Sequence, residues 1–344
     1  MNTLKYCTAL ACSLLAVSAV QAQQKILTVG GYGGSYEVLL KEKIIPPFEA
    51  KYNVKVVYVP GNSTENLAKL QAQKGNQEID VVLLDDGPMY QADGLGFCAP
   101  LTPAKIYDDI YDLAKISPNA VGYGIGVTGI AYSEDWFKKE GWEPPTSLND
   151  LLDPKYDQIM SIPPITNSYG LHALIMFARL NGGGEKNIDP GFAVFKDKLA
   201  PRVLAFEASS GKMSELFQSG ESAIAVWGNG RTKAVTDSGF KLGFAYPKEG
   251  SMALMVAACP IVDSDVPEEA QAFVQYMLEP QNQLPLADNQ ALAPVNKHAE
   301  LSAELQAYMP YGEEDIKGLL VPDWKTVNPL RDEWTKRWAR EIER

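Results

Sequence analysis

The fold is decided by the stretch Ile79-Asp80-Val81-Val82-Leu83-Leu84-Asp85-Asp86-Gly87-Pro88-Met89-Tyr90. Its apolar run is rich in Val and Leu and ends at the turn residues Gly87 and Pro88, which predicts a strand buried on both faces, as in parallel sheets. Ligands of open parallel sheets bind beyond the carboxyl ends of the strands. We therefore expect Asp85 and Asp86 to lie at a crevice and to favour a cationic group there.

A simpler interpretation stays open for these carboxylates. Asp is a preferred N-cap residue and Pro a preferred first helical residue, so Asp86 can also serve to cap a helix that begins near Pro88. Adjacent side chains of a strand point to opposite faces. Only one of the two carboxylates should then face the ligand, and Asp85 is the better candidate.

Working outward, the first 22 residues have the pattern of a cleaved secretory signal. Lys5 supplies the positive charge, residues 10–20 form the apolar core, and Val20-Gln21-Ala22 offers small residues for cleavage. Cys12 permits a lipoprotein, but the residues before it lack the expected Leu. With no other run of about 18 apolar residues, we expect a soluble periplasmic protein.

The charge composition limits the kinds of partner that the protein can bind. The chain of 344 residues carries 31 basic and 43 acidic residues, a net charge of -12. This balance argues against nucleic acid or an anionic membrane as a partner. Residues 23–344 suffice for two lobes of ordinary domain size.

The two cysteines beyond the signal, Cys98 and Cys259, both have apolar neighbours. An oxidising compartment permits a disulfide, but buried free cysteines are common, and we expect these two to be unpaired. The chain has only two histidines, His172 in an apolar run and His298 in a polar loop. We expect the first to be buried and hydrogen-bonded and the second to be solvated, with no metal site and no cofactor.

The pattern of elements predicts an α/β architecture. Residues 26–29, 54–59 and 80–84 should be strands, with helical spacing at 66–71 and Ser63 or Thr64 as cap, which gives a parallel β-α-β-α-β lobe. A glycine-rich extended run at 122–132 fits a crossover to a second lobe. That lobe should contain strands at 160–163, 203–206 and 223–227 and a helix at 171–180. An apolar run at 254–262 returns to the first lobe, and helices follow from Pro267, closing with 324–343, where Trp334 and Trp338 share a face.

Three polar segments are candidate ligand sites. The first, residues 30–36, places Ser35 at a helix start between Tyr32 and Tyr36, which suits a carboxylate or phosphate, although a tight turn capped by Ser35 is the alternative. In the second, residues 163–170, Asn167, Ser168 and Tyr169 enter a helix and either bind a polar ligand or only cap that helix. The third, residues 227–231, ends a buried strand and contains Trp227, Asn229 and Arg231. The guanidinium of Arg231 can bind a carboxylate and the ring of Trp227 can contact a cation. The alternative is that Arg231 only pairs with a surface acid.

The remaining motifs give little support for nucleotide binding or catalysis. Residues 124–129 match G-x-G-x-x-G, but no helix is expected after them, so a hinge is a better interpretation than a dinucleotide site. No catalytic motif built on Ser, Cys or His is present. A hydrolase that uses Asp85 and Asp86 remains formally open.

In the order of its motifs the chain resembles the bacterial extracellular solute-binding proteins of ABC importers, in the branch that binds spermidine, putrescine and 4-aminobutyrate. The shared features are the signal, Gly33-Gly34-Ser35-Tyr36, residues 80–96, the crossover 126–132, residues 227–231 and Pro247-Lys248-Glu249-Gly250. The resemblance spans the mature chain.

The resemblance implies a two-lobed periplasmic-binding-protein-like fold of type II, a ligand held between lobes joined by hinge strands, and delivery to an inner-membrane permease. Lobe 1 should comprise residues 23–125 plus 254–320, and lobe 2 residues 126–253 plus 321–344, in a monomer that is not an enzyme. Polyamine binders of the family carry an aromatic and an acid where this chain has Leu254-Met255-Val256, which favours a zwitterionic ω-amino acid over a polyamine. The residues expected to bind it are Tyr32, Ser35, Tyr36, Asp85, Asp86, Tyr90, Thr128, Asn167, Ser168, Tyr169, Trp227, Asn229 and Arg231.

Overall fold

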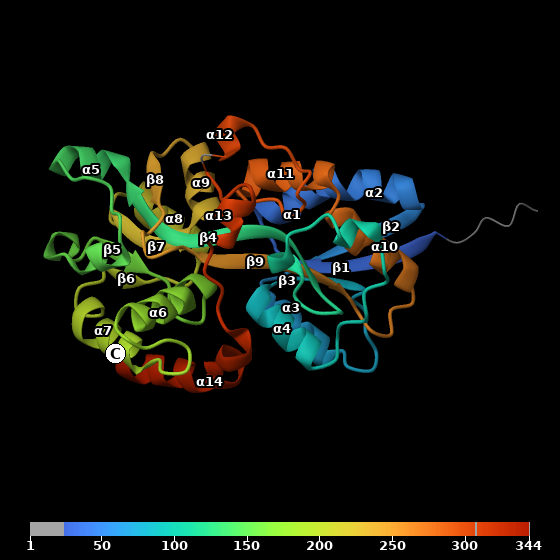
Figure 1. Ribbon diagram of the computed structural model, residues 1–344, viewed down its shortest axis with the longest axis horizontal. Helices are drawn as coiled ribbons and strands as arrows, with labels where there is room; N and C mark the ends of the chain where they lie inside the picture. The colour runs from blue at the N-terminus through green and yellow to red at the C-terminus, as the bar shows by residue number, and fades with distance from the viewer. Residues whose placement is uncertain (1–23, 307, 344) are drawn as a thin grey trace, which may run out of the picture.

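A mixed nine-stranded sheet runs through the molecule in the computed structural model, which describes residues 24–306 and 308–343 (Figure 1). The strand order is β2-β1-β3-β9-β4-β7-β5-β6, and β8 pairs with β4. The strands are β1 (Lys25–Gly31), β2 (Val54–Pro60), β3 (Val81–Asp85), β4 (Val121–Ser133), β5 (Met160–Ile162), β6 (Ala205–Phe206), β7 (Ile224–Gly228), β8 (Leu242–Ala245) and β9 (Met252–Pro260).

Helices cover both faces of this sheet. They are α1 (Ser35–Leu39), α2 (Ile45–Tyr52), α3 (Ser63–Ala72), α4 (Asp86–Gly94), α5 (Glu134–Glu140), α6 (Ser168–Leu180), α7 (Asp189–Val194), α8 (Ser210–Gln218), α9 (Asn229–Asp237), α10 (Pro267–Met277), α11 (Pro280–Gln290), α12 (Ala303–Gln306), α13 (Glu313–Lys317) and α14 (Trp324–Glu341). Single π-helical turns, Leu40–Ile44 and Phe195–Leu199, follow α1 and α7.

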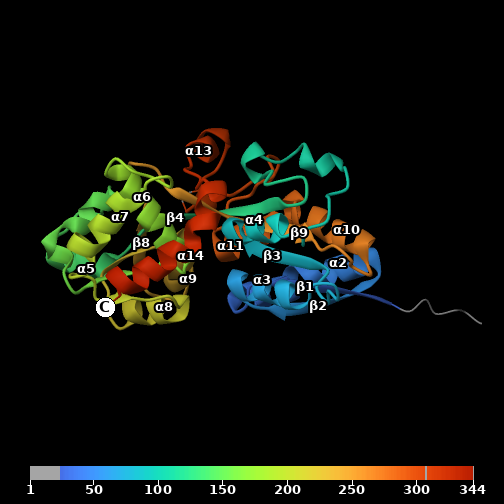
Figure 2. The same ribbon diagram turned by 90° about the horizontal axis from the view of Figure 1, so that it is seen from below.

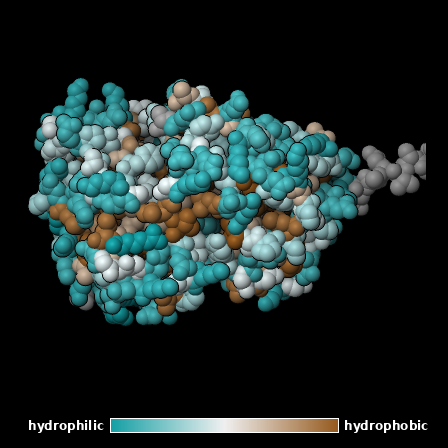
Figure 3. All heavy atoms as spheres, viewed as in Figure 1, coloured by the Kyte–Doolittle hydropathy of each residue, from teal (hydrophilic) through white to brown (hydrophobic). Residues whose placement is uncertain are grey.

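Two lobes are joined by β4 and β9. We call the part around β1, β2 and β3 lobe 1 and the part around β5, β6 and β7 lobe 2, which Figure 2 shows side by side. The glycine-rich strand β4 pairs with β9 over most of its length and then with β7 and β8, so it runs from one lobe into the other. The expected crossover is therefore present. In Figure 3 apolar residues are visible in a horizontal band along the middle of this face, at the level where β4 and β9 run in Figure 1, with mostly hydrophilic residues above and below it.

The decisive strand β3 is buried on both faces, as the sequence predicts. It lies parallel to β1 and antiparallel to β9. Val81 and Leu83 pack into a core that includes Phe273 of α10. Val82 and Leu84 pack on the other side against residues of α3. The apolar run is continuous because each face of the strand meets a helix layer.

The C-terminal helix α14 belongs to the core of lobe 2. Its Trp334 and Trp338 are buried, and the Trp338 ring lies 4.8 Å from Phe195 and 5.3 Å from Phe206 between centroids. The segment before it crosses from lobe 1 beside β9, where Leu320 bridges to Met252. Three segments of the chain therefore connect the lobes. The exact residue boundaries expected for the lobes remain a prediction.

Local details differ from the expectations at three places. Asn62 caps α3, with Glu65 completing a capping box, because the side chain of Asn62 accepts from the Glu65 amide at 2.9 Å. Ser63 is then free to accept a hydrogen bond from the backbone of Asp85 at 3.0 Å. The strand expected at 203–206 is only two residues long, and β8 was not expected at all.

The expectation of unpaired cysteines is wrong, because Cys98 and Cys259 form a disulfide. Cys98 comes shortly after α4, and Cys259 lies near the end of β9, which pairs with β3 directly before α4. Cys98 forms a backbone bridge with Ile261, two residues after Cys259. The Cα atoms of Cys98 and Cys259 therefore lie 5.5 Å apart. Their separation of 161 residues hides this proximity in the sequence.

We expect the replacement of both Cys98 and Cys259 by Ser to lower the free energy of unfolding by roughly 2 to 5 kcal/mol, since the disulfide closes a long loop in the unfolded chain. Denaturant unfolding of the oxidised protein, residues 23–344, and of the double variant measures this difference. Thiol titration of the unfolded wild type should detect no free thiol. Two reactive thiols together with unchanged stability would contradict the assignment.

Candidate functional site

A cleft between the lobes contains two adjoining cavities, a small one of about 70 Å3 and a large one of about 810 Å3. Five residues line both: Tyr32, Asp85, Tyr169, Arg231 and Leu254. The small cavity also has an apolar wall from β9 and the loop after α11, made by Val256 and Leu292. The large cavity is bordered by helix starts of both lobes and by α14. The cleft therefore combines apolar surface with charged groups of both signs.

Asp85 is the carboxylate that faces this cleft. Its Oδ1 accepts from the Tyr32 hydroxyl at 2.7 Å, and its Oδ2 accepts from the Ser168 hydroxyl at 3.1 Å. Tyr32 belongs to lobe 1 and Ser168 begins α6 of lobe 2, so the carboxylate is a meeting point of the two lobes. Each carboxylate oxygen has two lone pairs, which leaves Asp85 able to accept further donors.

Tyrosines form the aromatic part of the lining. The rings of Tyr32 and Tyr36 meet edge to face at 5.1 Å, and the Tyr36 hydroxyl donates to that of Tyr123 at 2.7 Å. Burial, with the nearby Asp85, raises the pKa of Tyr32 well above its ordinary value. Burial also raises the pKa of Tyr169, against the opposing effect of Arg231. These hydroxyls therefore stay protonated and act as hydrogen-bond donors.

Two guanidinium groups also line the cleft. Arg231, in the first turn of α9, borders both cavities. Arg331 of α14 borders the large one and is half-buried. Burial lowers the pKa of Arg331, and the charges of Asp85 and Asp86 act in the opposite direction. Arg331 therefore lies close enough to these carboxylates to interact with them across the cleft.

Several helices begin at the cleft. Residues at the starts of α3, α6 and α8 line the large cavity, and Gly230 and Arg231 of α9 line the small one. Helix N-termini carry partial positive charge and favour anions. Asn167 caps α6 by accepting from the Tyr169 amide at 2.9 Å, so its carbonyl oxygen serves the helix, while the residue still borders the cavity.

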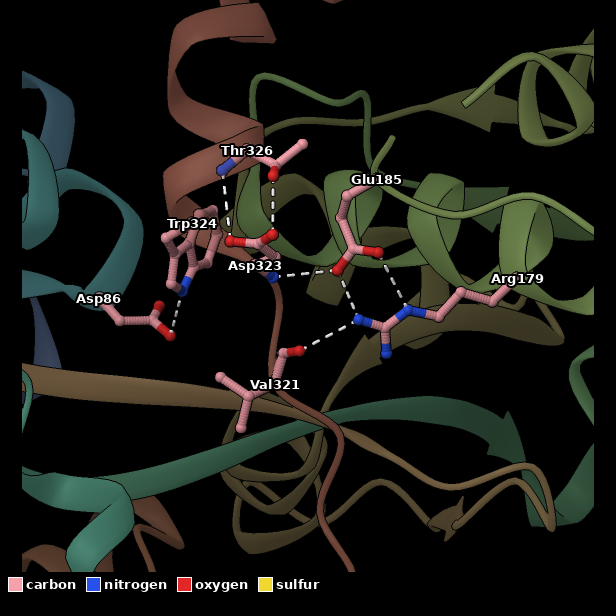
Figure 4. A network of polar contacts seen from close by, with 7 residues as sticks. All are labelled: Asp86, Arg179, Glu185, Val321, Asp323, Trp324 and Thr326. Atoms are coloured by element: carbon pink, nitrogen blue, oxygen red, sulfur yellow. Dashed lines mark hydrogen bonds and ion pairs between the residues drawn. The ribbon is translucent and has the colours of Figure 1, made fainter. Parts of the chain in front are cut away.

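Asp86 points away from the cleft and anchors the two lobes to each other. It is 3% exposed, and its Oδ2 accepts from the indole N–H of Trp324 at 2.8 Å (Figure 4). Burial raises the pKa of Asp86 to about 7. A Cβ at Gly87 would come within 2.7 Å of the Trp324 ring, so only glycine lets the indole approach. The expected role of Asp86 as a ligand or helix cap is replaced by this contact between α4 and α14.

The start of α14 is held from the other side by lobe 2. In Figure 4, Glu185 pairs with Arg179 and accepts from the backbone amide of Asp323 at 3.0 Å. Arg179 also donates to the carbonyl of Val321 at 3.1 Å. Asp323 caps α14 through Thr326. Trp324 thus sits at the end of a segment that is fixed to lobe 2, while its indole bonds to lobe 1.

Four further expected residues do not line either cavity. Thr128 is buried and bonds to Nδ1 of His172 at 2.7 Å. Trp227 is 1% exposed and stacks on Phe217, because the strand β7 turns it into the core beneath α8. Ser35 is exposed, and its hydroxyl accepts a hydrogen bond from the side chain of Gln290. Gly34, not Ser35, is the N-cap residue of α1. Tyr90 lies four residues into α4, packed against the lobe 2 core.

Asn229 borders the small cavity, but its side chain is committed to the backbone. It accepts from the Val127 amide at 3.0 Å and donates to the carbonyl of Ala291 at 2.8 Å. It therefore fixes the crossover strand to the loop after α11. Eight of the expected residues therefore line the cleft: Tyr32, Tyr36, Asp85, Asn167, Ser168, Tyr169, Asn229 and Arg231. Asp86 and Trp227 are buried elsewhere.

Arg331, Ser63 and the apolar wall of Leu254 line the cleft without having been expected there. Arg331 lies on the same face of α14 as the buried Trp324, Val327, Trp334 and Trp338, and a cation within that apolar row was the available signal. No local pattern indicates that α14 returns to the cleft. The position of α14 depends on the segment before it, which crosses between the lobes and has no periodic pattern in its sequence.

Comparison with known proteins identifies the family. Residues 43–310 match the bacterial extracellular solute-binding protein family. The chain belongs to this family. The family indicates a periplasmic location, and its members are substrate-binding transport proteins that deliver small molecules to a membrane permease. In the described part of the chain, no helix has the length and apolarity to cross a membrane.

This solute-binding protein is similar to the putrescine-binding periplasmic protein PotF of Escherichia coli, with 27% identity over an alignment that covers 94% of this chain and 95% of PotF. A crystal structure of an ABC transporter from Clostridium perfringens is 25% identical, with a TM-score of 0.77 over 92% of this chain and 99% of that one. The periplasmic binding protein AfuA of Actinobacillus pleuropneumoniae, bound to fructose-6-phosphate, is 22% identical, with a TM-score of 0.77 over 93% and 99%. The two-lobed periplasmic-binding-protein fold is thereby confirmed.

We expect the stability of this solute-binding protein to depend on pH through Asp86. Its pKa is about 7 when folded and near 4 when unfolded, so the folded state keeps a proton that the unfolded state loses. This contribution to the free energy of unfolding is therefore present below about pH 4 and is lost as pH rises to about 7. Asp86→Asn should remove that loss and raise the thermal midpoint at pH 8 relative to wild type.

The comparison uses the midpoint difference between variant and wild type at pH 4 and at pH 8, which cancels the titration of other groups. Asp93→Asn, on the same helix, serves as the control for a general change in charge. A difference that does not vary with pH would exclude a raised pKa at Asp86.

Proposed function

We propose that this protein captures a small zwitterionic solute, of the ω-amino acid kind, between its lobes and delivers it to an ABC permease. One observation carries the proposal: Asp85 of lobe 1 and Arg231 of lobe 2 line the same two cavities. A ligand with an ammonium group and a carboxylate matches this pair of opposite charges. The proposal takes the protein to work as a monomer with no cofactor.

The ammonium group would be held at Asp85. The carboxylate keeps acceptor capacity beside its bonds to Tyr32 and Ser168. Tyr32 and Tyr169 border the same position and offer ring faces to a cation. The apolar wall of Leu254 would contact the methylene groups between the two charges.

The carboxylate of the ligand would be held at Arg231. Guanidinium binds carboxylate through two parallel hydrogen bonds, which gives direction as well as affinity. The uncapped start of α9 adds partial positive charge at the same place. Arg231 is exposed and makes no ion pair within the described residues. It shares a hydrogen bond with Tyr169, and its remaining donors are available to a ligand.

Binding energy would drive hinge closure. Because Asp85 receives donors from both lobes, a ligand at this carboxylate gains all its contacts only when the lobes are together. A ligand that binds the closed form better shifts the population towards it. The strands β4 and β9 and the segment before α14 would serve as the hinge.

A polyamine is the second candidate, favoured by the similarity to PotF. A diamine needs a carboxylate at each end, but the shared lining of the two cavities contains one carboxylate and one guanidinium. Arg331 adds a second positive charge in the large cavity. Both arginines repel a dication, and this charge balance supports the zwitterion.

A hydrolase is the candidate from another class. It would require Asp85 and Asp86 to act on one bond as acid and base. Asp85 lines the cleft, whereas Asp86 is buried against Trp324. The divergence of the two side chains argues against joint action.

In a thermal-shift screen, we expect 4-aminobutyrate and related amino acids to raise the midpoint of the mature protein, since a ligand that binds only the folded state stabilises it by mass action. Putrescine and spermidine should produce a smaller shift or none. A larger shift with putrescine than with any amino acid would overturn the assignment of the ligand class.

We expect Arg231→Ala to abolish binding of carboxylate ligands and to leave the midpoint of the unliganded protein near that of wild type, because the side chain is exposed. Titration calorimetry with the best amino acid from the screen measures the affinity. Lys233→Ala, on the same helix and in a surface ion pair, is the matched control and should bind normally. Undiminished affinity in the Arg231 variant would remove Arg231 from the site.

A further inference from the structure

The arginines of this chain divide into two groups. Of the six that the structure describes, Arg179, Arg202, Arg337 and Arg340 form ion pairs with carboxylates. The two that make none are Arg231 and Arg331, and both line the large cavity. In a chain with a net charge of -12, acidic partners are plentiful, so this division singles out the cleft.

Arg331 is not placed merely to neutralise the carboxylates near it. Asp85 already accepts from the hydroxyls of Tyr32 and Ser168, and Asp86 accepts from the Trp324 indole and the Gly87 amide. These donors are neutral, and neither carboxylate comes within ion-pair distance of Arg331. The guanidinium therefore keeps its donors for another acceptor that reaches the cavity.

The large cavity has room and polarity for more than a simple ω-amino acid. Its volume of about 810 Å3 is near the upper end of ordinary ligand sites, which span about 300–1,000 Å3. Besides Arg331, it is bordered by Asn328 and Thr335 of α14 and by the starts of α6 and α8. Asn328 keeps one amide hydrogen beside its bond to the Gly87 carbonyl, whereas the Thr335 hydroxyl donates to the carbonyl of Arg331. An amide N–H and helix N-termini are groups that receive oxyanions.

The charges at the cleft leave one positive group unmatched by a simple zwitterion. A ligand ammonium would match Asp85 and its carboxylate would match Arg231, which leaves Arg331. Asp332 is the other acid of the large cavity, but it directly follows Arg331 on α14, and neighbouring helix positions do not face each other, so it does not pair with that guanidinium. A ligand with one more negative charge would balance the site.

We propose that Arg331 forms a second anion subsite and that the solute is an amino acid or amine with a net negative charge. This inference rests on the proposed function, because it assigns Asp85 and Arg231 to the same ligand. Arg331 is then a residue that determines specificity: it separates solutes with two negative charges from those with one.

The test uses three probes that share an amine and differ in acidic groups: 4-aminobutyrate, glutamate, which adds a carboxylate, and 3-aminopropylphosphonate, whose head group carries more charge. Calorimetric affinities are measured for wild type, Arg331→Gln and Lys336→Gln. Lys336 is an exposed residue of α14 outside the cleft, so its variant loses the same charge without touching the site.

We expect wild type to bind glutamate or 3-aminopropylphosphonate more tightly than 4-aminobutyrate. Arg331→Gln should lose that preference, with affinity for the favoured probe weaker by about ten- to hundredfold, as for a lost charge-assisted hydrogen bond. Lys336→Gln should keep it. The unliganded midpoint of each variant checks that it is folded.

The other outcomes are distinct. If 4-aminobutyrate binds as tightly as the two acidic probes, or if Arg331→Gln keeps the preference, the second subsite is overturned and the proposed function stands. If none of the three probes binds to wild type, the zwitterionic ligand class itself is overturned, and the subsite with it.

Discussion

Two adjacent carboxylates at the end of β3 lie on opposite sides of the backbone, and the cleft is built around that divergence. Asp85 emerges into the space between the lobes, where hydroxyls from both reach it. Asp86 turns inward, and its cost of burial is offset by the Trp324 indole. One strand end therefore supplies both a charge in the cleft and an anchor for the helix that borders the large cavity.

The positions of Asp85 and Asp86 depend on the continuous sheet that fixes the end of β3. β9 pairs with β3 on one edge and β4 on the other, so the strand end that carries Asp85 is connected through two ladders to lobe 2. Asn229 adds a side-chain link between β4 and the loop after α11. The glycines of β4 let the strand pass between closely packed neighbours, as at Gly129, where Phe244 leaves no room for a Cβ.

The fold and the centre of the site were predictable because they depend on local patterns. Apolar runs located most of the strands, and the residues after them located Asp85, Tyr169 and Arg231. Trp227 was assigned wrongly because the end of a strand alternates between core and cleft, and one residue decides which. The Cys98–Cys259 pair and the position of Arg331 depend on contacts across more than 150 residues, which composition and periodicity do not encode.

The helix α14 has a consequence for how the molecule is made. Lobe 2 begins at β4, but its core is completed only by the tryptophans of α14, which follow lobe 1's β9 in the chain. During synthesis from the N-terminus, lobe 2 keeps an uncovered apolar face until this helix follows. Lobe 1 likewise waits for β9 before β3 has its second neighbour. Each half thus depends on a segment that follows the other half in the chain, and the cleft between them forms only after both segments are in place.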